Sequence, residues 1–223
     1  MISLRCSDIT EILHGSLHGD DVTVTSVSTD SRSISAGELF IALKGPNFDG
    51  SAFVADVKAK GAAAVVVEHP VDCDITQIIV PDSRLALGQL AAALKARLAP
   101  KTIAVTGSAG KTTVKEMIAA ILARLGPVLA TQGNFNNDIG VPQTLLTLRP
   151  QHQMAVIEMG MNHPGEIDYL AGLVKPDVVL LTNAQREHQE FMKTVLAVAK
   201  ENGSAFTHLP PNGCAVFPVS EEF

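Results

Sequence analysis

The segment Thr-Gly-Ser-Ala-Gly-Lys-Thr-Thr at 106–113 constrains the fold more than any other part of the chain. An apolar run, 102–105, precedes it, and a run with apolar residues at helical spacing, 114–125, follows it. This order predicts a strand, a glycine loop and a helix. Glycines let backbone amides curve around a phosphate, and a helix start adds free N–H groups and a positive dipole end. The segment therefore predicts a nucleoside-triphosphate site.

The residues expected to hold the nucleotide are Gly107, Ser108, Ala109, Gly110, Lys111, Thr112 and Thr113. Lys111 is expected to neutralise the outer phosphates, and the Thr112 hydroxyl to bind Mg²⁺. The strict phosphate-loop pattern asks for a glycine where this chain has Val105, and here the first glycine is Gly107. A plain strand-to-helix turn with an exposed lysine is the alternative, but the flanking apolar periodicity favours the nucleotide site.

The composition is that of a globular protein. The 223 residues are 46% hydrophobic and 18% charged, which suits one large or two modest domains. The net charge of −6 and the lack of a Lys/Arg cluster argue against a nucleic-acid partner. No apolar run reaches the ~20 residues that span a bilayer, so we expect a cytoplasmic protein without membrane insertion. Cys6, Cys73 and Cys214 lack metal-ligand spacing and are expected to be ordinary buried or half-buried thiols.

Residues 1–85 are expected to form a small α/β domain of their own. Its predicted elements are helices at 7–14 and 51–60 and strands at 22–27, 38–43, 63–67 and 77–80. Polar residues at Thr29, Asp30, Ser31 and Arg32 follow the first strand directly. This composition suits a ligand loop, or equally a turn whose Asp and Ser satisfy the local backbone.

Residues 86–223 alternate strand and helix after a predicted helix at 84–98. Strands are predicted at 102–106, 128–131, 154–158, 177–182 and 214–217, and helices at 112–125, 141–148, 166–174 and 191–200. This alternation predicts a parallel sheet with right-handed crossovers, whose ligands lie at the carboxyl ends of the strands. The rule singles out the glycine loop, Glu158 and the segment 183–188.

Three groups of polar residues stand at these strand ends. Glu158 ends an apolar run, where a carboxylate is costly unless paired with a cation, so a metal-binding role competes with a helix-capping role. His188 follows the strand predicted at 177–182, although a lone histidine is more often structural. Asn134, Asn136 and Asn137 suit a substrate with carboxylate and hydroxyl groups, or left-handed turns.

Several motifs together resemble the ATP-dependent Mur ligases. They are the glycine loop, the asparagine segment 134–142, Val-Ile-Glu-Met-Gly at 156–160, and Thr-Asn at 182–183 followed by Glu-His at 187–188. Thr-Asp-Ser-Arg at 29–32, Phe-Ile-Ala-Leu-Lys-Gly at 40–45, Asp49-Gly50 and Phe53 resemble the member that adds D-alanyl-D-alanine to UDP-N-acetylmuramoyl-tripeptide. The resemblance extends over essentially the whole chain.

The resemblance implies an α/β protein with a UDP-substrate domain at 1–85 and an incomplete P-loop-type ATPase domain with a mostly parallel sheet at 86–223. It implies an enzyme that uses ATP and Mg²⁺ to form an amide bond through an acyl phosphate in peptidoglycan synthesis, and we expect a monomer. Lys111, Glu158 and His188 would act in catalysis, and Thr112, Glu158 and His188 would hold the metal. The implied substrate-binding residues are Thr29, Asp30, Ser31, Arg32, Lys44, Gly45, Asp49, Gly50, Asn134, Asn136 and Asn137.

The chain departs from the family pattern in two respects. A lysine that becomes carbamylated and binds a second metal is usual in the family, but the aligned residue here is Asn202, and Lys200 is a doubtful substitute. Family members also have a further domain that receives the dipeptide, so little or no ligation is expected from residues 1–223 alone.

Other functions are compatible with parts of the pattern. Another Mur ligase would share the glycine loop, whereas the uridine-type first domain argues against the related folyl-polyglutamate ligase. A guanine-specific switch would need Asn-Lys-x-Asp after a strand, and residues 183–186 are Asn-Ala-Gln-Arg. A module that binds a UDP-sugar or a nucleotide without catalysis is the remaining alternative.

Overall fold

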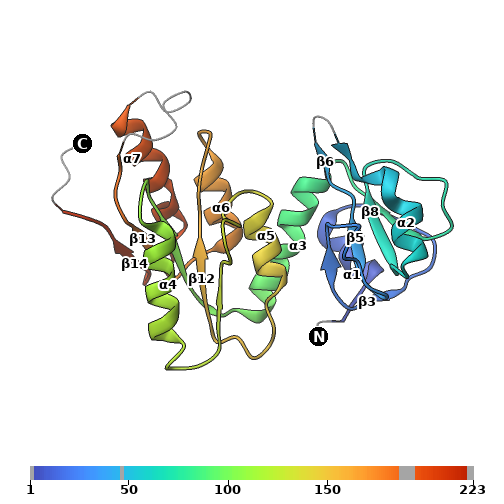
Figure 1. Cartoon of the computed structure of the whole chain (residues 1–223), viewed down its shortest axis with the longest axis horizontal. Coiled ribbons are helices and arrows are strands. Elements are labelled where there is room, and N and C mark those ends of the chain that lie inside the picture. The colour runs from blue at the N-terminus through green and yellow to red at the C-terminus, as the bar shows by residue number, and fades with distance from the viewer. Residues whose placement is uncertain (1–2, 46–47, 186–193, 220–223) are drawn as a thin grey trace. The chain divides into compact units, whose positions relative to one another are not determined.

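The computed structural model describes residues 3–45, 48–185 and 194–219. The chain divides into two compact units, Met1–Ala93 and Leu94–Phe223, within helix α3 (Ser83–Leu98; Figure 1). The predicted domains divide near the start of the same helix. Asp82 caps the start of this helix, since its Oδ1 accepts the amides of Arg84 and Leu85 at 2.8 and 2.9 Å. Each unit is built on a largely parallel sheet, which confirms the predicted α/β class.

The first unit contains a five-stranded sheet in the order β2-β9-β8-β5-β4. Its strands are β2 (Ser16–His18), β4 (Val27–Ser28), β5 (Leu39–Ile41), β8 (Ala64–Val67) and β9 (Thr76–Ile79). Only β2 runs antiparallel to its neighbour within this sheet. All residues of β5 and β8 are buried, as expected for central strands whose sequences are continuous apolar runs. The core includes Phe40 and Val65, packed with Val54 and Val57 of helix α2 (Val54–Ala59).

The strand predicted at 22–27 is wrong as a single element. The structure divides it into β3 (Thr23–Val24), which pairs with β1 (Leu4–Arg5), and β4, which pairs with β5 in the larger sheet. The chain changes sheet at Thr25, whose amide donates to the Gly37 carbonyl at 3.0 Å. The remaining elements are helix α1 (Cys6–Leu13), the hairpin β6 (Lys44–Gly45) and β7 (Phe48–Asp49), and a 3-10 turn at Gly50–Phe53.

The second unit is a five-stranded, fully parallel sheet in the order β11-β12-β10-β13-β14. Its strands are β10 (Lys101–Thr106), β11 (Val128–Ala130), β12 (Met154–Glu158), β13 (Val178–Leu181) and β14 (Cys214–Val216). The connecting helices are α4 (Lys111–Leu122), α5 (Gly140–Leu146), α6 (Glu166–Val174) and α7 (Val195–Gly203), with a 3-10 turn at Ser204–His208. The edge strand β14 is exposed, so Cys214 is an exposed thiol and not the buried or half-buried one predicted.

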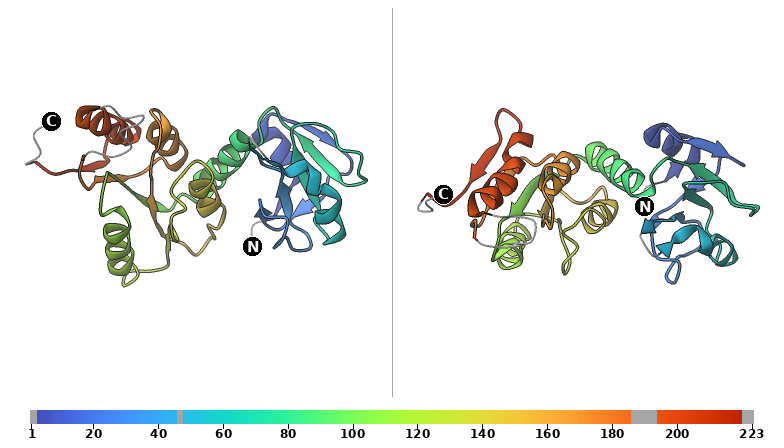
Figure 2. Two further views of the ribbon diagram at one scale, coloured as in Figure 1. Left: turned by 45° about the horizontal axis from the view of Figure 1, so that its top comes forward. Right: turned by 90° about the horizontal axis from the view of Figure 1, so that it is seen from above.

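The two faces of this sheet are covered differently. Figure 2 shows α4 on one face and α6 and α7 on the other, and α5 and α7 both contact α6. The main packing partners of α4 are strands β10, β11 and β12, so only one side of this helix is covered. The predicted apolar stripe is therefore largely wrong: Met117, Ile121 and Leu125 are 62%, 67% and 73% exposed, whereas Lys115 is fully buried. Within the described ranges, no helix is both long and apolar enough to cross a membrane.

Candidate functional site

Two glycines shape the loop between β10 and α4, and the first of them, Gly107, is required for two reasons. Gly107 has φ 125° and Gly110, which precedes the helix, has φ 78°, and both values are strained for residues with a side chain. A Cβ on Gly107 would also collide with the Thr182 hydroxyl and lie 2.9 Å from the Asn183 carbonyl oxygen. A Cβ on Gly110 would meet no atom within 4 Å. Gly107 is therefore the position at which the loop lies in close contact with Thr182 and Asn183, which follow β13.

That segment binds the loop through several hydrogen bonds. The amides of Ser108 and Ala109 donate to the Asn183 carbonyl and side-chain oxygens at 3.0 and 2.9 Å. The Thr182 hydroxyl donates to the Ala109 carbonyl at 2.8 Å, and the Gln185 amide donates to the Ser108 hydroxyl at 2.8 Å. Because the Ser108 and Ala109 amides already donate to Asn183, the backbone amides that remain available to a ligand here are those in the first turn of α4, which lack helical partners.

Lys111, the first residue of α4, directs its ammonium back over the loop. Its Nζ donates to the Gly107 carbonyl at 2.5 Å and lies 3.3 Å from the Ser108 carbonyl. Its side chain thus places a positive charge inside the loop that the sequence predicts to hold phosphates. Thr112 and Thr113 follow in the same helical turn and are exposed.

Glu158 is brought beside this loop by strand register. It ends β12 and pairs with Val105 of β10, the strand that leads directly into the loop. The residue is 2% exposed, and its Oε1 accepts a hydrogen bond from Asn136 Nδ2 at 2.8 Å. Its Oε2 is buried and makes no hydrogen bond with any residue in the described part of the chain. A buried carboxylate oxygen without a partner costs about 1–3 kcal/mol or more, and a cation would remove that cost.

These residues fit a magnesium ion shared with a nucleotide. Mg²⁺ takes oxygen ligands and is usually held by one or two protein groups together with phosphates, which Glu158 and Thr112 could supply. Among the described residues, no group of three or more His, Cys, Asp or Glu side chains could hold a metal by itself. His188, the other predicted ligand, lies outside the described residues.

The asparagine segment is folded tightly against the end of β12. The Asn136 carbonyl accepts the Gly160 amide at 2.8 Å, so Asn136 is joined to this strand end by both a backbone and a side-chain hydrogen bond. Asn137 Oδ1 accepts the Gly140 amide at 2.8 Å at the start of α5, which is the local turn role considered from sequence. Asn134 is exposed. Of the three asparagines, only Asn136 is joined to Glu158 by a hydrogen bond in the described structure.

Sequence reasoning missed Thr131, which lies directly after the edge strand β11. It is 1% exposed, and its hydroxyl accepts the Glu158 amide at 2.9 Å. Apolar periodicity could not single it out, because one threonine after a strand is common in turns.

In the first unit, Lys44 and Asp49 pair across the β6-β7 hairpin. They line a pocket of about 80 Å³ together with Ser51, Glu68 and His69. Asp49 Oδ1 accepts the Ser51 amide at 2.9 Å, and the bonds from Ser51 lower the pKa of Asp49 below its ordinary value. A Cβ on Gly50 would lie 2.8 Å from the Leu43 carbonyl oxygen, so glycine is required beside this hairpin. Gly45 is the hairpin residue paired with Phe48.

Within the tetrad of residues 29–32, Asp30 and Arg32 bind each other. The Arg32 guanidinium binds both carboxylate oxygens of Asp30, at 2.8 to 3.2 Å, and the Arg32 amide donates to Asp30 Oδ1 at 2.9 Å. The Ser31 carbonyl accepts Lys60 Nζ at 2.6 Å. These bonds form the turn considered from sequence, and the Arg32 side chain remains 88% exposed.

The Arg32 side-chain hydrogen bonds, followed by its backbone amide, lower the pKa of Asp30 to about 2. We expect the Asp30 carboxyl signal to titrate near this pH in an NMR pH titration, and Arg32→Ala to move its pKa up toward about 3.9. Because the folded pKa is depressed, the stabilisation is present above the ordinary pKa and is lost as pH falls through about 2. An unchanged Asp30 titration in Arg32→Ala would show that the guanidinium does not hold the carboxylate.

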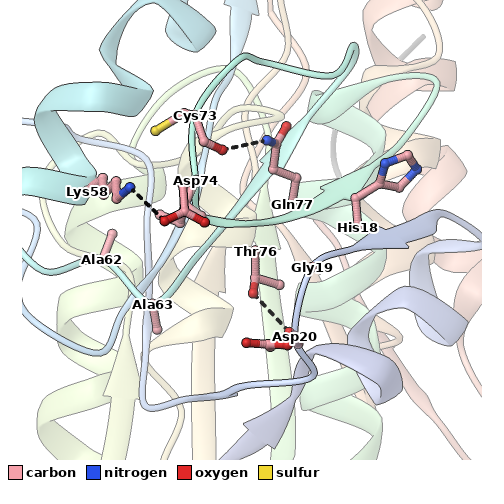
Figure 3. Close-up of a pocket in the computed structure, with 11 residues that line it drawn as sticks. His18, Gly19, Asp20, Lys58, Ala62, Ala63, Cys73, Asp74, Thr76 and Gln77 are labelled. Atoms are coloured by element: carbon pink, nitrogen blue, oxygen red, sulfur yellow. Dashed lines mark hydrogen bonds and ion pairs between the residues drawn. The ribbon is translucent and has the colours of Figure 1, made fainter.

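A second pocket of the first unit lies at the other end of its sheet (Figure 3). Its volume is about 580 Å³, and it opens at the amino ends of β8 and β9. Its polar groups bind one another: Lys58 and Asp74 form an ion pair at 3.6 Å, and the Thr76 hydroxyl donates to the Asp20 carbonyl at 2.9 Å. No substrate residue predicted from the sequence lines this pocket.

The position aligned with the family's carbamylated lysine is buried under the start of the glycine loop. Asn202 of α7 is 1% exposed, and its Oδ1 accepts the Thr106 hydroxyl at 2.5 Å. Its amide nitrogen donates to the Val198 carbonyl at 3.1 Å. Lys200 is exposed, so it does not occupy this buried position.

Comparison with known proteins places these features in one family. The Mur ligase middle domain matches residues 105–223, and the catalytic domain of the Mur ligase family matches residues 23–125. The UDP-N-acetylmuramoyl-tripeptide–D-alanyl-D-alanine ligase of Escherichia coli K12 is 48% identical over 216 residues, which are 97% of this chain and 48% of that protein.

Solved structures agree. A crystal structure of MurF from Acinetobacter baumannii has a TM-score of 0.96 at 40% identity, covering 100% of this chain and 50% of that one. The MurF ligase from Thermotoga maritima, in complex with ADP, has a TM-score of 0.82 at 30% identity, covering 89% of this chain and 46% of that one. The chain thus spans about half the length of these relatives. Since the middle-domain match alone covers more than half of its residues, the chain belongs to the Mur ligase family.

Proposed function

We propose that this chain is the UDP-substrate-binding and ATP-binding part of a ligase that joins D-alanyl-D-alanine to UDP-N-acetylmuramoyl-tripeptide. The observation that carries the proposal is the buried Glu158, which pairs with Val105 beside the glycine loop and whose Oε2 makes no hydrogen bond with the described residues. The relatives that bear this activity in their names, at 48% identity in one case, supply the substrate class. The reaction would contribute to peptidoglycan precursor synthesis.

The chemistry begins with a poor electrophile. A free carboxylate does not react with an amine, so the γ-phosphoryl group of ATP is transferred to a carboxylate oxygen, giving an acyl phosphate and ADP. The amine of D-alanyl-D-alanine then attacks the carbonyl carbon, the amide forms, and inorganic phosphate leaves with the oxygen it received. Positioning and charge neutralisation are the protein's contribution to such a phosphoryl transfer.

Each part of the site has a role in this proposal. Lys111 and the first amides of α4 bind the phosphates, and Thr112, Glu158 and His188 hold Mg²⁺. A bound Mg²⁺ neutralises charge on the transferring phosphoryl group. Asn136 orients the Glu158 carboxylate through its 2.8 Å hydrogen bond.

The substrate contacts proposed for the first unit are its polar strand-end loops. They comprise the tetrad Thr29 to Arg32, the hairpin residues Lys44, Gly45 and Asp49, and Gly50. Asn134, Asn136 and Asn137 would line the path of the muramoyl group in the second unit.

The test is phosphate release by a protein of the relatives' length that contains this chain. We expect release with ATP, Mg²⁺ and UDP-N-acetylmuramoyl-tripeptide to require D-alanyl-D-alanine for sustained turnover, because only the amine discharges the acyl phosphate. Glu158→Gln, which keeps the shape but removes the charge, should abolish turnover and leave binding of the UDP-substrate intact. A rate of phosphate release that is the same with and without the UDP-substrate and the dipeptide would refute the proposed ligase activity.

A non-catalytic nucleotide-binding and UDP-sugar-binding protein is the second candidate. The observation in its favour is Asn202, a neutral side chain bonded to Thr106 where the resemblance leads one to expect a metal-binding lysine carbamate. The same assay distinguishes the two functions, because a binding protein would retain both ligands without releasing phosphate.

A further inference from the structure

Lys115 is the one fully buried lysine among the described residues, and it lies one helical turn after Lys111 on the same side of α4. Lysines are almost never fully buried unless they are paired, because an ammonium loses its hydration when it leaves water. A buried lysine so close to the glycine loop therefore needs a specific reason.

The contacts of Lys115 supply that reason. Its Nζ donates to the backbone carbonyl of Thr131 at 2.7 Å and to Glu116 Oε1 at 2.5 Å. The Glu116 side chain is 65% exposed, so the carboxylate remains in water while the ammonium is buried. Of the two hydrogen bonds of the Lys115 ammonium, the buried one is consequently the bond to Thr131.

Thr131 is connected in turn to Glu158. The Thr131 amide donates to the Val156 carbonyl at 3.0 Å, which continues the pairing of β11 with β12 by one residue. The Thr131 hydroxyl accepts the Glu158 amide at 2.9 Å. Two buried hydrogen bonds, one to the carbonyl and one to the hydroxyl of Thr131, therefore connect Lys115 of α4 with the backbone of Glu158.

We propose that Lys115 is a positioning residue that acts through Thr131 to hold Glu158 in place for a metal-bound nucleotide. The inference rests on the proposed function, since it assigns the ion of that same site to Glu158. Asn136 fixes one carboxylate oxygen of Glu158, and the Lys115–Thr131 connection fixes the backbone from which the carboxylate projects. Groups that orient a metal ligand in this way typically change metal affinity about 10- to 100-fold when they are removed.

The experiment measures ADP binding to the 223-residue chain by calorimetry, first in EDTA and then across a Mg²⁺ titration. We expect Lys115→Met to raise the Mg²⁺ concentration that gives half of the metal-dependent gain in ADP affinity by about tenfold or more. Its ADP affinity in EDTA should equal that of the unsubstituted chain, because Lys115 does not contact the loop amides. A merely structural role would lower stability without moving the Mg²⁺ titration.

Lys95→Met is the matched control. Lys95 is 9% exposed, and its Nζ donates to the Lys175 backbone carbonyl at 2.8 Å, so it makes the same kind of contact as Lys115. Lys175 precedes β13, at the opposite end of the sheet from the glycine loop. This variant should lose stability, as Lys115→Met does, while its Mg²⁺ titration stays that of the unsubstituted chain.

Thr131 provides a second pair of variants should Lys115→Met fail to fold. Thr131→Val removes the hydroxyl that accepts the Glu158 amide but keeps the carbonyl that accepts Lys115, so it should reproduce the shifted Mg²⁺ titration. Thr131→Ser keeps the hydroxyl and should restore the original titration.

The outcomes separate this inference from the proposed function. If the unsubstituted chain binds ADP with a Mg²⁺-dependent gain and a folded Lys115→Met leaves that dependence unchanged, the positioning role of Lys115 is refuted while the nucleotide site stands. If Lys115→Met does not fold, an unchanged dependence in Thr131→Val refutes it in the same way. If the unsubstituted chain binds no ADP at all, the proposed function fails, and the positioning role fails with it.

Discussion

Lys111→Ala should lower the rate of phosphate release by about 10²- to 10³-fold in a protein of the relatives' length that contains this chain. The ammonium lies within the glycine loop, 2.5 Å from the Gly107 carbonyl oxygen, where it would meet the negative charge of the outer phosphates. Its removal takes away charge stabilisation that develops as the phosphoryl group transfers. Affinity for the UDP-substrate, which the first unit is proposed to bind, should not change.

A lysine elsewhere in the second unit provides the control for this prediction. Lys101 begins β10, the strand that leads to the loop, and its side chain is 75% exposed and paired with Asp177 at 2.9 Å. Lys101→Ala should leave phosphate release unchanged, since exposed ion pairs contribute little. Equal rates for Lys111→Ala and Lys101→Ala would remove the proposed phosphate role of Lys111.

Gly107→Ala should destabilise the second unit by about 2–5 kcal/mol, which combines the strain of a positive φ with the cost of overpacking. The added methyl group would collide with the Thr182 hydroxyl and crowd the Asn183 carbonyl. Because Asn183 binds the amides of Ser108 and Ala109, displacing it should also disrupt the loop and abolish nucleotide binding.

Gly110→Ala separates the two causes. At this position φ is 78° but a Cβ would have open space, so only the strain remains and the loss should be about 1–2 kcal/mol. Urea unfolding followed by tyrosine fluorescence measures both variants in the second unit alone, because Tyr169 of α6 is the only tyrosine and the chain has no tryptophan. Similar losses for the two variants would mean that Thr182 and Asn183 move aside easily.

The sequence was sufficient to predict the central strands of the second unit and the position of Glu158. Strands β10, β12 and β13 are short apolar runs between helical segments, and a parallel sheet covered by helices on both faces is the arrangement that buries such runs. Once the sheet is parallel, the rule that ligands lie at strand carboxyl ends is enough to bring Glu158 toward the loop, and the register of Val105 with Glu158 agrees.

The sequence was insufficient to predict the burial and partners of residues that contact backbone groups far away in the chain. Lys115 looks like part of a solvated helix face, and its partner is the Thr131 carbonyl, a group that every residue carries and no pattern reveals. Met117 and Ile121 are apolar at helical spacing, yet they are exposed because strands cover only one side of α4. The break within 22–27 likewise depends on Gly37, which a local pattern does not include.

The strand order of the second unit also has a consequence for how this chain acquires its structure during synthesis. β10 sits at the middle of the sheet, but Ile103 pairs with Val156 on one side and Val178 on the other, both far downstream. While the ribosome adds about 5–20 residues per second, β10 and the glycine loop must wait several seconds before either neighbour emerges. During that interval the apolar strand has no sheet partner, so nascent chains carrying this topology gain from any factor that shields it until β12 arrives.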